Sequence, residues 1–188
     1  MQSDYNALRL KSVDLHIEAI DQKKDLTIDG VTVSQREARP GDTIHLNVSL
    51  VGENGAETSR QFAYQVPIGA EPGPLYFTVA DAGTTNITDF HQAVGGTTHS
   101  STQLIATVND LHPNTRAYIR VWRADPAFQL EGVDIPSPPA SVSLVLSGWQ
   151  TSLAGVSQTR NSKVAQMEFD AGDVVISGVK TVQVDIKE

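Results

Sequence analysis

The sequence predicts a β-rich protein of the α+β class, built from a β-sandwich and a smaller inserted α/β unit. Between residues 5 and 66, apolar side chains alternate with polar ones in several short runs. This period of two is typical of half-buried strands. Beyond residue 74 such runs are mixed with helical spacing, and the end of the chain returns to alternation. Four or five short strands separated by turns favour an immunoglobulin-like sandwich.

The clearest strand follows a turn at Pro40 and Gly41. Proline fixes φ near about −65° and suits the second position of a turn, and glycine readily takes the positive φ that the next position needs. After the turn the period becomes two. We therefore expect a buried row of Ile44, Leu46, Val48 and Leu50, and a solvent-facing row of Thr43, His45, Asn47 and Ser49.

Three further patterns are expected to belong to the sandwich. Alternation over Val13, Leu15, Ile17 and Ala19 predicts a strand, with a change of phase at Lys11-Ser12 relative to Leu8 and Leu10. Asp29-Gly30 predicts a hairpin turn between Ile28 and Val31. Near the end of this region, a further strand is indicated by Phe62, Tyr64 and Val66.

The segment PIGAEPGP, residues 67–74, is the best candidate for a boundary, because it is rich in proline and glycine. We expect residues 1–67 to form the sandwich, completed by residues 165–188, and residues 68–164 to form the smaller unit. Within that unit we expect strands at LYFTVAD and RAYIRVWRAD and a helix over Leu104–Leu111 that Ser101 caps. IPSPPASVSLVLSGW fits a helix capped by Ser137, although its β-branched residues also suit a strand.

The composition excludes several functions. With 39% hydrophobic and 19% charged residues, the 188-residue chain is an ordinary globular protein. Its net charge of −8 and scattered basic residues oppose a nucleic-acid or anionic-membrane surface. The chain has no cysteine, which excludes disulfides and thiolate chemistry. We expect no membrane insertion, since no apolar run approaches the length of a spanning helix, and the N-terminus lacks the features of a signal peptide.

No motif predicts catalysis or a cofactor. G-x-S-x-G is absent, and His99 beside Ser100 is a poor catalytic pair because sequence neighbours seldom reach hydrogen-bonding geometry. The five histidines include no H-x-H or H-E-x-x-H pair, although His16 and His45 could be neighbours on adjacent strands. A weak calcium site is the remaining metal hypothesis, at Asp170 and Asp173 or at Asp81, but aspartate beside glycine is first a turn signature.

The run YIRVWR places Tyr118, Arg120 and Trp122 on one face of a predicted strand, and Ile119 and Val121 on the other. Both faces are half apolar, which favours a strand covered on both sides. If the face were exposed, Tyr118, Arg120 and Trp122 would be typical of a protein-binding surface. They are therefore the candidate binding residues, and the aromatic rings also leave a carbohydrate platform as an alternative.

The order of the motifs resembles a known family region. The series ARPGDTIHLNVSL, VPIGAEPGPLYFTVADAG, SSTQLIATVNDLHPNTRAYIRVWRAD, IPSPPASVSLVL and GDVVISGVKTVQVDI is similar to the region after the peptidase module in bacterial SpoIVB-type serine peptidase proteins. The resemblance runs from about Arg39 to Ile186. That family's serine lies in a GMSGSP-like segment with a histidine upstream. Neither occurs here, so no catalytic residue carries over.

The resemblance implies a non-catalytic accessory module in a periplasmic or extracellular setting. Its partner would be a peptidase module of the same parent chain or another envelope protein. Two other classes remain open from the residues: an extracellular adhesion or carbohydrate-binding sandwich, which needs exposed aromatic rings, and a small enzyme of unrecognised type, which needs a polar pocket with perturbed groups.

Overall fold

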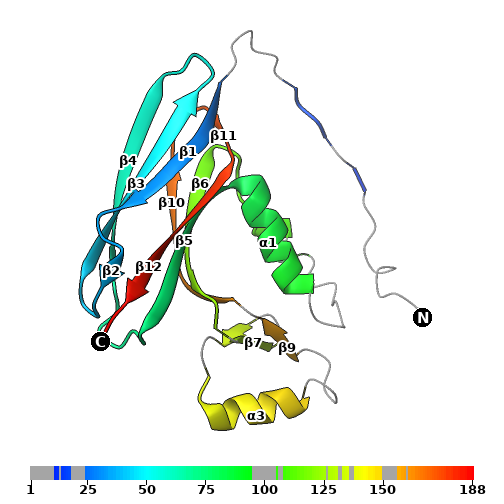
Figure 1. The fold of residues 1–188 in the computed structure, drawn as a ribbon. Coiled ribbons are helices and arrows are strands. Elements are labelled where there is room, and N and C mark those ends of the chain that lie inside the picture. The colour runs from blue at the N-terminus through cyan, green and yellow to red at the C-terminus, as the bar shows by residue number, and fades with distance from the viewer. Residues whose placement is uncertain are drawn as a thin grey trace.

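The computed structural model describes residues 11–12, 14–17, 24–94, 105, 108–125, 127–130, 133–135, 138–149, 156–159 and 161–188. Two β-sheets pack face to face, one helix lies on the outer side of the second sheet, and a smaller unit projects from one end (Figure 1). The predicted β-rich sandwich is therefore confirmed.

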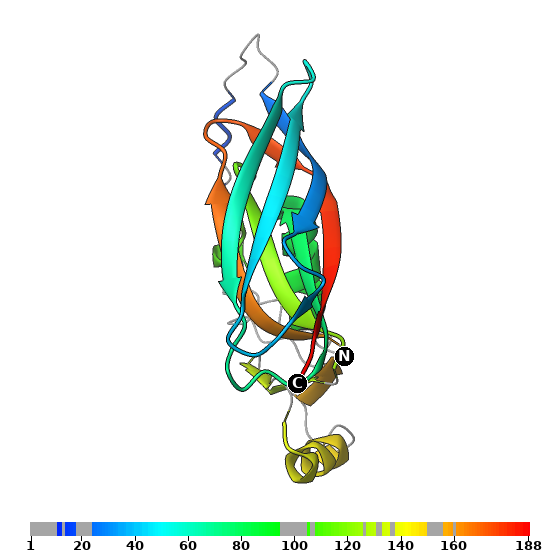
Figure 2. The same ribbon diagram turned by 60° about the vertical axis from the view of Figure 1, so that its left-hand side comes forward.

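Sheet A has the strand order β11-β1-β3-β4. Its antiparallel part is β1 (Asp25–Val33), β3 (Thr43–Gly52) and β4 (Glu57–Gln65), and β11 (Val175–Ser177) joins β1 in parallel. β11 comes from the C-terminal part of the chain and forms the edge of this sheet beside β1 (Figure 2). Sheet A therefore joins segments that lie more than a hundred residues apart in the sequence.

Sheet B has the strand order β10-β6-β5-β12-β2. Its members are β2 (Glu37–Ala38), β5 (Gly73–Asp81), β6 (Arg116–Arg123), β10 (Ser162–Asp170) and β12 (Val179–Ile186). β5 lies between β6 and β12 and is antiparallel to both. The C-terminal strand thus returns to the sandwich, paired with β5.

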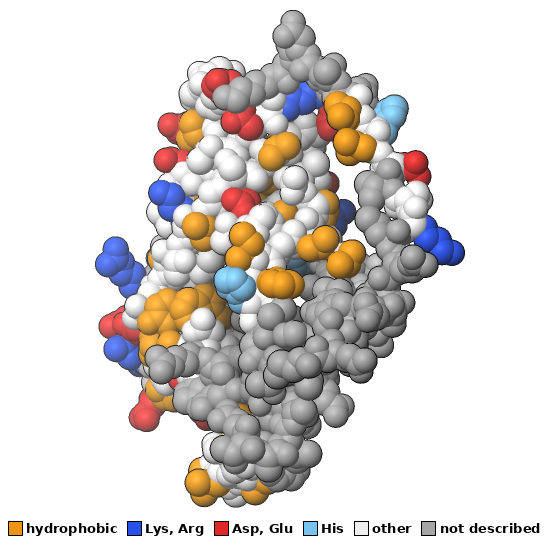
Figure 3. Space-filling view, turned by 90° about the vertical axis from the view of Figure 1, so that its right-hand side faces the viewer, with side chains coloured by type: hydrophobic (Ala, Val, Ile, Leu, Met, Phe, Trp, Pro, Cys, Tyr) orange, Lys and Arg blue, Asp and Glu red, His pale blue; other side chains and the backbone are white. Residues whose placement is uncertain are grey.

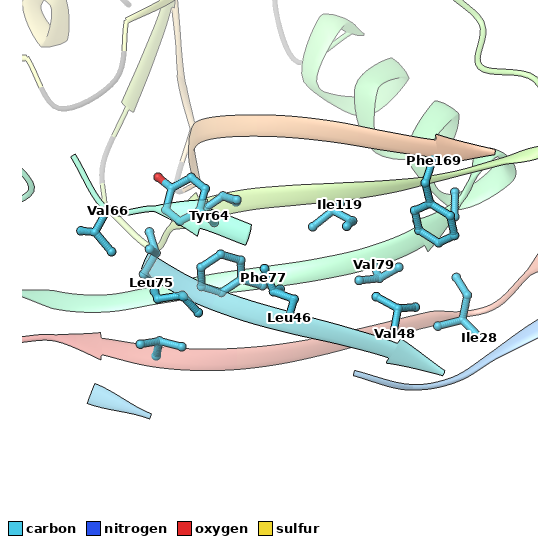
Figure 4. Close-up of a cluster of buried hydrophobic side chains, with 14 of the residues drawn as sticks. Ile28, Leu46, Val48, Tyr64, Val66, Leu75, Phe77, Val79, Ile119 and Phe169 are labelled. Carbon is cyan, nitrogen blue, oxygen red and sulfur yellow. The ribbon is translucent and has the colours of Figure 1, made fainter. Parts of the chain in front are cut away.

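The main core fills the space between the two sheets (Figure 4). Sheet A contributes the predicted row Ile44, Leu46, Val48 and Leu50, each fully buried. Sheet B contributes Phe77, Val79, Ile119 and Val121. The edge of the Tyr64 ring meets the Phe77 ring at a centroid distance of 5.4 Å. Alternation along β3 and β5 therefore predicted correctly which side chains face inward. Along β6 it predicted correctly which side chains share a face.

The turn before β3 has the geometry that its residues predict. The amide of Asp42 donates to the carbonyl of Arg39 at 3.0 Å, and Gly41 has a φ of 93° between them. The Asp42 carboxylate accepts the Arg39 amide at 2.8 Å. Gly41 and Asp42 also exchange backbone hydrogen bonds with Val66, which anchors the turn to the end of β4.

Two local predictions in the N-terminal region are wrong. Asp29-Gly30 makes no hairpin, because β1 continues through both residues and its register against β3 shifts between Ile28 and Gly30. Asp29 is the extra residue of a β-bulge. Residues 14–17 belong to no strand and are exposed, so His16 is not a strand neighbour of His45. Residues 1–10, 13 and 18–23 lie outside the described part of the chain.

The boundary expected at residues 67–74 does not separate two cores. β5 and β6, which we had assigned to the smaller unit, belong to sheet B and supply part of the main core: Leu75, Phe77, Val79, Ala117, Ile119 and Val121. A smaller unit exists between β6 and β10, where Phe128, Ile135 and Leu146 form a second cluster. It consists of β7 (Ala127–Leu130), β8 (Val133–Ile135), α3 (Ala140–Trp149) and β9 (Val156–Thr159).

The helix predicted in IPSPPASVSLVLSGW is present as α3. It begins after Pro139, whose carbonyl accepts the amides of Val142 and Ser143 at 2.9 Å. Ser137, the expected cap, is outside the described residues. Of the helix expected over 104–111, residues 105, 108 and 109 are helical, whereas 101–104 and 106–107 are not described.

Candidate functional site

Helix α1 (Ala82–Val94) follows β5 directly and lies on the outer face of sheet B. Asp81 starts it as an N-cap: one carboxylate oxygen accepts the Thr84 amide at 2.6 Å, and the other accepts the Gly178 amide at 2.7 Å. A single side chain therefore ties the first turn of α1 to the start of β12.

Between α1 and sheet B is a cleft of about 190 Å³. The floor comes from the outward rows of β5 and β6, and α1 forms one wall. The polar and aromatic side chains that line the cleft include Thr78, Thr84, Thr88, Arg120, Trp122 and Lys163. Tyr118, Arg120 and Trp122 all line the cleft, so the structure brings the three predicted binding residues to one site.

Asp89 of α1 is the centre of an ionic cluster. Its carboxylate accepts from the Arg120 guanidinium at 2.5 Å and contacts His112 Nε2 at 3.0 Å. The Arg120 side chain is only 11% exposed, and its Nε is buried without a hydrogen-bond partner in the described structure. Asn86 adds two hydrogen bonds to the backbone of His112. These contacts fasten α1 to sheet B.

Tyr118 is buried rather than exposed to solvent. It is 1% exposed, and its ring lies 4.3 Å from the His112 ring. Burial raises the pKa of the phenol, and the nearby Glu168 carboxylate adds to the increase while Arg116 opposes it. Of the predicted row, Tyr118 is packed under the helix and Arg120 is ion-paired. Trp122 is partly exposed and is not ion-paired, so it is the residue of the row with the most contact surface for a ligand.

Trp122 is held on two sides. Its ring stacks on Tyr76 at a centroid distance of 4.4 Å, and its Nε1–H donates to Thr78 Oγ1 at 2.9 Å. The Thr78 hydroxyl is in turn 2.9 Å from the Thr181 hydroxyl. The indole is therefore fixed in orientation before any ligand arrives, which lowers the entropy lost on binding.

The residues considered for metal binding and catalysis have structural roles where they are described. Asp170 accepts the Gly172 amide at 2.6 Å, and Asp173 pairs with Lys24 at 2.6 Å. The Lys24 ammonium lowers the pKa of the Asp173 carboxyl. Within the described residues, no group of three or more His, Asp or Glu could hold a metal ion. His99 and Ser100 lie outside those residues.

Sequence reasoning missed Asp89 and His112, together with α1 itself. The available signal was Asp81 three residues before Thr84, an N-cap pattern that we weighed only as a turn or calcium site. The helix is rich in threonine and its exposed side carries Ile87 and Phe90, so no apolar stripe marks its buried side. Figure 3 shows hydrophobic side chains on the face that α1 presents.

Comparison of the chain with protein-family models, curated proteins and solved structures finds no match. Among the helices described, none has the length and apolar character needed to cross a membrane.

Proposed function

We propose that this chain is a non-catalytic interaction module that binds a protein partner through the cleft between α1 and sheet B. One observation carries the proposal: the cleft combines a fixed indole, Trp122, with an exposed lysine, Lys163, above a floor in which Thr78 is hydrogen-bonded and Arg120 is ion-paired. An oriented aromatic ring next to hydrogen-bond donors is typical of a recognition site.

The bonding of the lining favours binding over catalysis. The Thr85 hydroxyl donates to the Asp81 carbonyl at 2.7 Å, and the Thr88 hydroxyl donates to the Thr84 carbonyl at 2.8 Å. Asp89 is shared by Arg120 and His112, so its charge is balanced by a guanidinium. A catalytic hydroxyl needs a base that is free to take its proton, whereas this carboxylate serves to position α1.

The chemistry of the cleft points to a ligand rich in acceptors. Lys163 and the half-buried Trp122 offer a positive charge and an apolar ring, which suit an acidic side chain that follows an apolar one in a peptide. The resemblance to the region after a SpoIVB-type peptidase module supports a peptidase module of the same parent chain, or another envelope protein, as the source. A periplasmic or extracellular location is part of this proposal, as is the immunoglobulin-like nature of the sandwich.

The test is a titration of the chain with a separately produced SpoIVB-type peptidase module. The background is Trp149→Phe, which leaves Trp122 as the sole tryptophan. We expect a saturable change in Trp122 emission and a loss of affinity of at least tenfold in Lys163→Glu. The matched control is Lys180→Glu, which makes the same charge change on the exposed part of β12. Equal affinity in both variants would contradict the proposed site.

A carbohydrate is the second candidate ligand, because Trp122, stacked on Tyr76, lines the cleft together with threonine side chains. Titration with neutral oligosaccharides distinguishes the two. Saturation by a neutral sugar that is insensitive to Lys163→Glu but lost in Trp122→Ala would favour the carbohydrate.

For either ligand we propose that the chain carries out no hydrolysis. Turnover of casein or model esters that falls on mutating Ser100 or His99 would overturn the proposal that the module is non-catalytic.

A further inference from the structure

Residues 14–17, with Leu15 and Ile17, have the alternating pattern of a β-strand but pair with no described strand. The apolar residues alternate with Asp14 and His16, yet Leu15 is 78% exposed and Ile17 is 77% exposed. Two large aliphatic side chains in one phase, both in water, lose the free energy that burial would give them. A period-two segment gains most by pairing with a sheet that has an open edge.

Sheet A has such an edge at β4. β3 pairs with one side of β4, and no described strand pairs with the other. Glu57–Gln65 is long and contains neither proline nor glycine, so a row of backbone donors and acceptors is free along it. The corresponding edge of sheet B, β10, is interrupted by a register shift between Lys163 and Ala165, and such bulges protect edges from pairing.

The inward side of β4 also has apolar surface to offer. Phe62 is only half buried, and its ring lies 4.9 Å from Phe169 of β10, where the two sheets meet. Further along the same inward row, Arg60 and Thr58 are exposed, so sheet B does not cover this end of β4. A strand added beside β4 would place its apolar row over Phe62 and over the part of β4 that sheet B leaves uncovered.

We propose that the segment around Leu15 and Ile17 of one copy adds a strand to the β4 edge of a second copy, and that the exchange is reciprocal. The arrangement of the chain favours a second copy over the segment's own sheet. In Figure 1, β4 lies on one flank of the molecule, and residues 14–17 lie beyond α1 on the other flank. Reciprocal exchange of this kind closes with twofold symmetry and leaves neither β4 edge open.

The absence of cysteine makes the test direct. One batch of full-length chain carries His16→Cys, and three others carry Ser59→Cys, Gln61→Cys or Ala63→Cys, in the outward row of β4. We expect His16→Cys to form a disulfide with at least one β4 variant after mixing. The matched control is Gln183→Cys, exposed on β12, which should give no cross-link above background.

Light scattering across a concentration series supplies the second measurement. We expect the wild-type chain to reach twice the monomer mass of 20.2 kDa, and Leu15→Asp/Ile17→Asp to remain monomeric with an unchanged circular dichroism spectrum, because both side chains are solvated in the single chain. A wild-type chain that stays monomeric overturns the proposal. So does a dimer that survives the double substitution, and so does a failure of His16→Cys to cross-link to any of the three β4 variants above the Gln183→Cys background.

Discussion

Leu46 and His45 are neighbours on β3 that point in opposite directions, and they test the sandwich directly. Leu46 is fully buried between the sheets and lies near Phe77 (Figure 4). The side chain of His45 is exposed. The perturbation is truncation of each to alanine. Leu46→Ala removes atoms from a packed site that cannot collapse freely, because strands on both sides fix its walls.

The expected difference between the two variants is large. Leu46→Ala should lower the free energy of unfolding by about 2–5 kcal/mol, which combines lost transfer energy with the cavity left behind. For a chain of this size each kcal/mol corresponds to roughly 3 °C in Tm, so the melting temperature should fall by roughly 6–15 °C. His45→Ala should change the free energy by less than about 0.5 kcal/mol, because its backbone contacts to Ser34 do not involve the imidazole.

Urea unfolding followed by circular dichroism gives both free energies, and an unchanged slope confirms that the same surface is exposed. Pro40→Ala should fall between the two variants, since proline at this turn mainly restricts the unfolded chain. If His45→Ala proved as damaging as Leu46→Ala, the outer face of sheet A would have to be covered in solution. That result would refute the assignment of the two rows.

Three further outcomes follow from particular contacts. Gly41→Ala should lower the free energy of unfolding by about 1–2 kcal/mol in urea melts, because alanine resists a positive φ. A Cβ at Gly41 would meet nothing within 4 Å, so the loss would come from the backbone alone. Gly55→Ala, also at positive φ, should show a similar loss, and no loss in either variant would contradict this reason. Asp89→Asn should release α1 from Arg120 and speed amide exchange in α1 while β3 stays protected; equal protection of α1 would contradict the clamp. Burial raises the pKa of Tyr64 and Tyr118 above 10.0. The stability that these neutral phenols contribute is therefore present below pH 10 and is lost as pH rises through their folded-state pKa values. Ultraviolet titration should show these two phenols ionising only above pH 10 and together with unfolding, and ionisation of both below pH 10 in the folded chain would refute this.

The sequence predicted the facing of side chains better than the grouping of strands. Alternation in residues 43–50 and 75–79 reveals which residues point inward, and in residues 117–122 it reveals which residues share a face, because both depend only on the pleat. It does not reveal which sheet a strand joins. We therefore placed β5 and β6 in a separate unit. In the structure β5 pairs with β12, about a hundred residues later in the chain, and β6 lies between β5 and β10 of the same sheet.

The candidate site depends on contacts that no local pattern encodes. Tyr118, Arg120 and Trp122 were found because they share one face of β6. The partner of Arg120 is Asp89, 31 residues earlier in the chain, on α1. The threonines of α1 and its exposed apolar residues leave no apolar stripe at helical spacing, so the sequence does not indicate a helix there. An ion pair between distant elements leaves no signature in composition or spacing, so only the arrangement of α1 on sheet B shows it.

The cleft and the β4 edge share no residue, and this allows the two proposals to fail separately. Leu15→Asp/Ile17→Asp should abolish the dimer and leave the titration of Trp122 with the peptidase module unchanged. Lys163→Glu should weaken that titration and leave the dimer intact. Loss of both properties in the N-terminal variant would mean that the partner binds only the paired form. The cleft would then be one part of a larger surface that the second copy completes. A wild-type dimer that is lost in Leu15→Asp/Ile17→Asp, with no titration of Trp122 in any form of the chain, would support strand exchange and remove the cleft as a binding site.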